Sequence, residues 1–250
     1  MLKQADLLML HHLVPDEVEP GSLAPNLRFY EPRTAHGSSL SPARPRPRRL
    51  IEAGQEDDVV GLVIGTRSGR LARRLLSYVA LDLLVAVSKP VVLVPPHTAM
   101  PFELRRVLVP LDGTNVTAAA LTETVALARD AEVELDVLHV HDEDSLPLFS
   151  EQPQHETESW AREFLARYCP TVDLDRLHLR VGAPGEHVVR VAEETGADLI
   201  ALGWAQDLSS GRAAVVREAL RRSRVPVLLV PVAAAAPGPP ATAPASTMSA

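Results

Sequence analysis

Few residues in this chain have both the side-chain type and the position that chemistry requires. Asp112 follows the apolar run Val107–Leu111 and precedes Gly113 and Thr114. A carboxylate at the end of a strand can bind a ligand hydroxyl. An aspartate in this position also caps a turn through Asx hydrogen bonds to the backbone two residues on. The sequence leaves both interpretations of Asp112 open.

A second candidate is the segment 209–212, Ser-Ser-Gly-Arg, which precedes a helical pattern. Its backbone N–H groups could form an anion-binding nest, with Arg212 pairing to a phosphate. The alternative is that Ser209 or Ser210 only caps the helix.

His139 and His141 are two residues apart, so in a strand their imidazoles share one face. The spacing reveals no third ligand, and the sequence therefore predicts no metal site and favours a polar strand edge. The sequence also contains no Gly-x-Ser-x-Gly elbow, no P-loop and no zinc signature. We assign no catalytic residue on these grounds.

The composition excludes several classes of function. The 250 residues carry a net charge of −7, which provides no general attraction to nucleic acid. No uncharged apolar run is long enough to span a bilayer, and the N-terminus is a poor signal peptide. The single cysteine, Cys169, fits a reducing compartment and a core position at a helix end. We expect a cytoplasmic protein.

From residue 107 to 230, patterns typical of strands alternate with patterns typical of helices. Apolar runs predict strands at Val107–Leu111, Glu134–Val140, Leu177–Val181, Asp198–Gly203 and Val225–Val230. Helical spacing predicts helices over 116–129, 155–168, 185–195 and 213–222, the third ending at Gly196. Such alternation predicts an α/β fold with a doubly wound, five-stranded parallel sheet and helices on both faces.

Part of this pattern occurs a second time, nearer the N-terminus. Gly61–Gly65 and Leu199–Gly203 are apolar strands that end in glycine, and a Ser-Gly-Arg loop follows each of them. A helical pattern comes next, and then the apolar strand Val91–Val94 or its counterpart Val225–Val230. The repetition predicts an incomplete second copy of the module.

The N-terminal copy is expected to lack its beginning. Residues 5–12 resemble the second strand of the complete module, 134–141, and nothing before them can supply a first strand and a first helix. Because the first strand is normally central in this topology, we expect the copy to lean on the C-terminal module or on a partner chain, or the start of the sequence to be placed too late.

The ordered set of motifs resembles the universal stress protein family. The matching motifs are Val107-Leu-Val-Pro-Leu-Asp112-Gly-Thr114, Leu138-His139-Val140, Val181-Gly182-Ala-Pro184, Ala197-Asp-Leu-Ile-Ala-Leu-Gly203 and Val225-Pro226-Val-Leu-Leu-Val230. The N-terminal copy matches from about Gly61 to Pro96, and weakly at 5–14. The resemblance implies an adenine nucleotide alpha hydrolase-like fold, dimerisation and a role in stress survival.

Some members of this family bind ATP through Gly, two residues, a second Gly, nine residues, and Gly followed by Ser or Thr. The glycines let backbone N–H groups approach the phosphates. Gly203 matches the first glycine, but the second falls on Gln206 and the Gly-Ser pair on Ala213-Ala214. In the N-terminal copy, Tyr78 would crowd a phosphate. The resemblance therefore implies a dead first site and a degenerate second one.

In an open α/β sheet, ligands bind at the carboxyl ends of the strands, where the strand order reverses. The residues predicted to line such a nucleotide site are Leu111, Asp112, Val140, Leu202, Gly203, Gly211, Ala213, Ala214 and Val215. ATP is the candidate cofactor of this site.

These patterns predict a partial domain over 1–97 with a Pro/Arg-rich loop at 31–50, a linker at 98–104, a complete domain over 105–232 and an Ala/Pro-rich tail at 233–250. The favoured function is a non-enzymatic regulatory protein of the stress response, which acts through dimer or partner contacts and has a degenerate nucleotide site. An adenine-nucleotide-binding stress sensor is the alternative. Only Asp112 is a candidate for weak ATP hydrolysis.

The last strand, Val225–Val230, is an apolar edge that invites pairing. We expect it to pair with Val91–Val94, which would make a pseudo-dimer within one chain, or with a second chain. Nucleic acid and membrane are not expected partners.

Overall fold

The computed structural model describes residues 6–10, 27–30, 51–52, 54–57, 59–65, 83–95, 98, 104–141, 153–207 and 213–232. The expected loop at 31–50, the tail at 233–250 and both Ser-Gly-Arg segments lie outside these residues, as does Tyr78. Within the described part of the chain, no helix is both long and apolar enough to cross a membrane.

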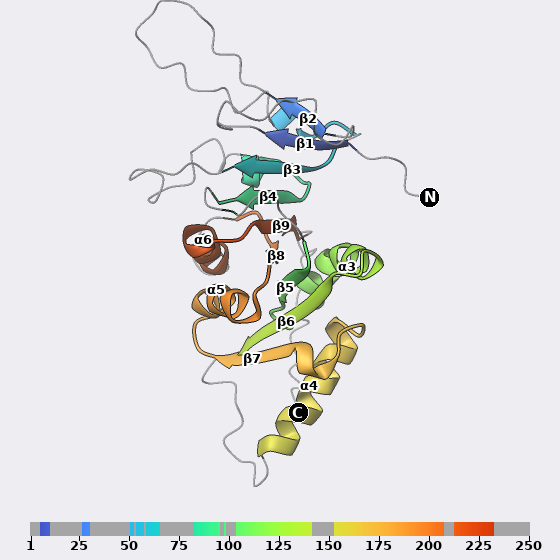
Figure 1. Cartoon of the computed structure of the whole chain (residues 1–250), viewed down its shortest axis with the longest axis vertical. Coiled ribbons are helices and arrows are strands. Elements are labelled where there is room, and N and C mark those ends of the chain that lie inside the picture. Colours follow the sequence, from blue (N-terminus) through green and yellow to red (C-terminus); the bar gives the residue numbers. More distant parts are fainter. Residues whose placement is uncertain are drawn as a thin grey trace, which may run out of the picture.

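The C-terminal module is the predicted doubly wound sheet (Figure 1). Its strands are β5 (Arg106–Pro110), β6 (Glu134–His141), β7 (Leu177–Val181), β8 (Leu199–Trp204) and β9 (Val227–Pro231). They lie in the order β9-β8-β5-β6-β7, and all neighbouring pairs are parallel. The order reverses between β5 and β8, as the fold class requires.

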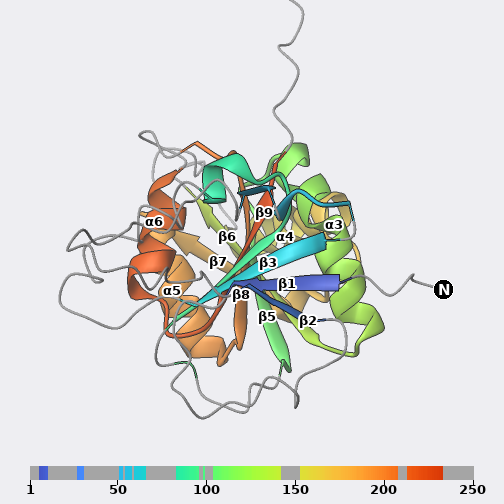
Figure 2. The same cartoon turned by 90° about the horizontal axis from the view of Figure 1, so that it is seen from above.

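Four helices cover this sheet. Helices α3 (Asn115–Asp130) and α4 (Pro153–Tyr168) lie on one face, and α5 (Pro184–Thr195) and α6 (Ala213–Arg222) lie on the other. The short 3-10 helix η3 (Leu174–Arg176) leads into β7. Seen from above, the strands fan out with the twist of the sheet between the two helical layers (Figure 2).

The helix ends follow from the local sequence. Thr114 precedes α3 and accepts a hydrogen bond from the N–H of Thr117, which satisfies one orphan donor of the first turn. Gly196 ends α5 with a φ of 66°, the left-handed conformation that glycine adopts without steric cost. The predicted end of this helix is therefore confirmed.

The N-terminal part extends the same sheet. Its strands are β1 (Asp6–Leu10), β2 (Leu27–Tyr30), β3 (Val59–Gly65) and β4 (Val91–Val94), in the order β2-β1-β3-β4. β4 lies antiparallel to β9, with Val92 opposite Leu228, so that one nine-stranded sheet runs through the molecule. The two segments whose pairing the sequence suggested thus lie side by side.

The assignment of residues 5–12 to a second strand is wrong. β1 pairs in parallel with β3, the strand that corresponds to β8, and so takes the position that β5 holds in the C-terminal module. β2 takes the next position, which corresponds to β6. An opening strand is therefore present. Short apolar strands resemble one another in sequence, and only pairing across the sheet decides which position each one fills.

The largest core joins the two parts. Leu62, Leu83, Leu93 and other residues of the N-terminal part pack in one buried cluster with Leu202, Leu229 and their neighbours. A second cluster lies between the sheet and helices α3 and α4. The strands that form the crevice described below are therefore supported from both parts of the chain.

Candidate functional site

A crevice of about 220 Å³ opens at the carboxyl ends of β5, β6 and β8. Its wall includes these members of the predicted set: Leu111, Asp112, Val140, Leu202, Gly203, Ala213 and Val215. Ala214 is exposed and does not line the crevice, and Gly211 lies outside the described residues. The β-strand topology brings these dispersed positions together because parallel strands end at one edge of the sheet.

Asp112 is exposed at the mouth of the crevice and holds the turn into α3. Its Oδ1 accepts hydrogen bonds from the backbone N–H of Thr114 at 3.0 Å and from the Thr114 hydroxyl at 2.7 Å. This is the Asx arrangement that the sequence offered as one interpretation, and it is confirmed. Only the Oδ1 oxygen of the carboxylate makes these two hydrogen bonds, which stabilise the turn.

Gly203 lies next to the last residue of β8, at a place where a side chain would be tightly packed. A Cβ on this residue would lie 3.0 Å from Thr117 Cγ2 and 3.2 Å from Val232 Cγ2. The close approach of α3 and of the chain after β9 therefore favours glycine here. Packing alone explains why this residue is glycine, and no ligand contact is needed to explain it.

Gln206 is the residue whose role the sequence did not reveal. It has a φ of 55°, a left-handed conformation that is uncommon for a residue with a side chain. Its Nε2 donates to the carbonyl oxygens of Val87 at 2.7 Å and Leu84 at 3.2 Å, in the N-terminal part. The family pattern placed a glycine at this position, which was the only signal that the backbone here is unusual.

The crevice wall is largely apolar. Leu138, Val140 and Val188 line one side, and Trp204 and Val216 contribute to the rest. The volume lies below the roughly 300–1,000 Å³ of pockets that enclose drug-sized ligands. The described residues of the wall present an apolar surface that also includes the Asp112 carboxylate.

The two histidines of β6 lie on the opposite face of the sheet from the crevice, because side chains alternate along a strand. The ring centroid of His139 lies 4.6 Å from that of Phe164 and 5.1 Å from that of Trp160. His141 packs against Trp160 at 4.5 Å. Burial lowers the pKa of His139, and burial together with the nearby His139 lowers the pKa of His141. These rings form an aromatic cluster under α4.

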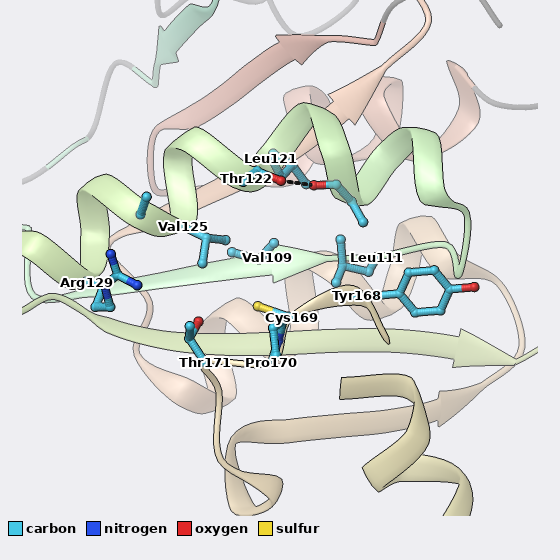
Figure 3. Close-up of a pocket in the computed structure, with 12 residues that line it drawn as sticks. Val109, Leu111, Leu121, Thr122, Val125, Arg129, Tyr168, Cys169, Pro170 and Thr171 are labelled. Atoms are coloured by element: carbon cyan, nitrogen blue, oxygen red, sulfur yellow. Dashed lines mark hydrogen bonds between the residues drawn. The ribbon is translucent and has the colours of Figure 1, made fainter. Parts of the chain in front are cut away.

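A second, smaller cavity of about 160 Å³ lies between α3 and the chain after α4 (Figure 3). Val109, Leu121 and Val125 make up much of its wall, and Arg129 lies at one end. Cys169, directly after α4, borders it and is buried, as the sequence predicted. Burial raises the pKa of this thiol, so the reactive thiolate form is disfavoured.

The fold and the crevice define a doubly wound α/β protein with an apolar strand-end site. Comparison with known families shows which family this protein belongs to. The model of the universal stress protein family matches residues 103–231, more than half of the chain. The chain belongs to the universal stress protein family.

Solved structures support the same fold. The chain is similar to a universal stress protein from Archaeoglobus fulgidus DSM 4304, with 21% identity and a TM-score of 0.55 over 74% of this chain and 65% of that one. It is also similar to a protein of unknown function from Pseudomonas aeruginosa PAO1, with 19% identity and a TM-score of 0.65 over 92% of this chain and 94% of that one.

The N-terminal end has a different similarity. The model of the central catalytic domain of glycosyl hydrolase family 65 matches residues 1–46. A 43-residue segment, 17% of this chain, is 54% identical to kojibiose phosphorylase from Escherichia coli (strain K12), and it spans only 6% of that protein's length.

Proposed function

We propose that this chain is a non-enzymatic regulatory protein of the stress response, which acts through protein contacts and whose crevice is a degenerate nucleotide site. The observation that carries the proposal is that two polar side chains at or beside the crevice make hydrogen bonds within the chain. Asp112 Oδ1 holds a turn, and the side chain of Gln206, next to the lining residues Ala205 and Asp207, reaches the N-terminal part. These two groups are thus engaged in intramolecular contacts.

We also propose that residues 1–97 are the shortened first unit of a tandem protein. Strands β3 and β4 are parallel neighbours joined through a helix, as β8 and β9 are. The antiparallel contact between β4 and β9 would then replace a contact between two chains, and the pair would act as a pseudo-dimer. The similarity of residues 1–46 to another family fits a unit whose beginning has a separate origin.

Equilibrium dialysis with labelled ATP and Mg²⁺ tests the degenerate site. We expect no retention at millimolar ligand, and no phosphate release above the buffer rate. A ligand that binds only the native state raises the melting temperature by mass action, so thermal unfolding with and without MgATP is an independent measurement. Retention at micromolar ATP would contradict the proposal.

The second candidate function is an adenine-nucleotide sensor, and the apolar crevice favours it. In this case MgATP raises the melting temperature, and Asp112→Ala reduces the shift. Asp112→Ala also removes two hydrogen bonds from the turn, which we expect to cost about 1–2 kcal/mol of unfolding free energy. Asp112→Asn keeps an acceptor oxygen for the turn, so it separates loss of ligand binding from loss of stability.

A further inference from the structure

Gln206 occupies a backbone conformation that needs compensation. Its φ of 55° is unfavourable for a residue with a Cβ relative to glycine. Such conformations persist where the surrounding structure holds them. Here the hydrogen bonds of the Gln206 side chain stabilise the left-handed conformation.

The side-chain amide of Gln206 caps a helix 119 residues away in the sequence. The helix over 83–86 ends there, and its last carbonyl groups have no partner within the helix. Gln206 Nε2 lies 2.7 Å from the Val87 oxygen, 3.2 Å from the Leu84 oxygen and 3.5 Å from the Val85 oxygen. An amide nitrogen has two hydrogens, so the two shorter contacts are the effective ones. We name this set of contacts the Gln206 clamp.

The clamp begins in the wall of the crevice. Trp204, Ala205 and Asp207, on both sides of Gln206 in the chain, line the crevice. We call residues 204–207 the crevice loop. Trp204 also packs in the same core cluster as Leu84, whose carbonyl accepts from Gln206. The crevice wall and the end of the 83–86 helix are therefore joined by a hydrogen-bonded and an apolar contact.

We propose that Gln206 is a positioning residue that couples the shape of the crevice loop to the docking of residues 83–94. A ligand that displaces the crevice loop must lengthen the clamp. Loss of the docked segment must in turn free the loop. Such coupling is reciprocal by thermodynamic necessity. The inference goes beyond the proposed function, since it holds whether or not a nucleotide binds in the crevice.

The test is hydrogen–deuterium exchange of the full chain with Gln206→Glu at pH 7.5. Glutamate has nearly the shape of glutamine, but its carboxylate cannot donate and faces carbonyl oxygens. We expect at least about tenfold faster exchange both in peptides of 83–94 and in peptides of 201–207, because two partly buried hydrogen bonds are lost. The protonated acid can donate again, so lowering the pH toward 4.5 should bring the variant closer to the wild type measured at the same pH.

Gln55→Glu is the matched control. Gln55 Nε2 donates to the Ala86 oxygen at 3.0 Å, at the same helix end, but Gln55 does not line the crevice. This variant should accelerate exchange around 83–87 and, because the coupling is reciprocal, raise exchange at 201–207 by clearly less than Gln206→Glu does. Equal effects of both variants on 201–207, or no effect of Gln206→Glu there, would overturn the coupling.

A third variant, Gln206→Gly, introduces no backbone strain, because glycine adopts the left-handed conformation of residue 206 without steric cost. Gln206→Gly relieves the left-handed residue and removes the clamp, so the chain folds while exchange at 83–94 and 201–207 still rises. If Gln206→Glu does not fold, this variant decides. If residues 83–94 of Gln206→Gly exchange as slowly as those of the wild type, the proposal is wrong.

Discussion

His139 connects β6, the β5–α3 turn and α4 through one imidazole ring. Nδ1 lies 2.8 Å from the Leu111 carbonyl oxygen, which can only accept, so Nδ1 carries the proton of the neutral ring. The ring packs against Phe164 and Trp160, and Asp112 is the nearby charge that favours the protonated form. Burial outweighs Asp112, and the folded protein holds the pKa of His139 below its usual value.

This shift predicts a loss of stability in mild acid. The unfolded chain binds a proton at His139 near pH 6.5, and the folded chain binds it only at lower pH. The unfolding free energy that His139 contributes is therefore present above about pH 6.5 and is lost as the pH falls through the folded pKa. Urea unfolding between pH 8 and 5 measures it.

The control is His139→Gln, which can donate to Leu111 but does not titrate. Its unfolding free energy should depend less on pH over this range than that of the wild type. His141, whose pKa is also lowered, contributes to the dependence that remains. Identical pH profiles of wild type and His139→Gln would contradict the assignment.

At the scale of single residues, the sequence identified Asp112 and Gly203 from their positions at strand ends. It left the role of Asp112 open, because an Asx turn and a ligand contact require the same residue in the same place. Gln206 could not be found, since its partners, Leu84 and Val87, come from a distant segment. A left-handed glutamine has no local signature.

At the scale of elements, the end of β8 and the first turn of α3 set the width of the crevice. A Cβ on Gly203 would lie only 3.0 Å from Thr117 Cγ2, so a methyl group there would be tightly packed. We predict that Gly203→Ala lowers the unfolding free energy by about 1–3 kcal/mol, because the new methyl must push α3 and Val232 apart. Chemical denaturation measures this change.

Thr117→Ser provides the compensating variant. It removes the Cγ2 that the new methyl would meet at 3.0 Å and keeps the hydroxyl. The double variant Gly203→Ala/Thr117→Ser should recover about half or more of the loss, as coupled neighbouring sites do. Additive effects of the two substitutions would show that the contact does not limit the packing.

The elements of the C-terminal module were the most predictable part of the fold. The strand Leu177–Val181 and the helix 213–222 begin and end where the sequence placed them. The end of α5 was predictable because Gly196 acts on the backbone within its own turn. The position of β1 was not, since its pairing with β3 is a long-range contact.

At the scale of the whole molecule, β4 covers the edge of β9. Pairing with β4 leaves β9 with neighbours on both sides, so this edge is not free to bind a second copy. We predict that the wild-type chain is a monomer by light scattering. A dimer at low micromolar concentration would contradict this expectation.

Val92→Pro should open the edge. Val92 lies in the middle of β4, opposite Leu228 of β9, and β3 is on its other side. Proline removes an N–H from a strand that is paired on both sides, which we expect to cost about 3 kcal/mol or more. The uncovered β9 then favours concentration-dependent dimers. Val92→Thr keeps the β-branched shape and the N–H, and should remain monomeric.

The sequence by itself determined the alternation of strands and helices from 107 to 230, the doubly wound class and the residues at the strand ends. These features depend on side-chain periodicity and on interactions within one turn of chain. Only the tertiary structure decided the position of β1, the antiparallel contact between β4 and β9, and the reach of Gln206 to Val87. Each of these joins segments far apart in the sequence, and a short apolar strand or a single polar side chain does not specify its distant partner.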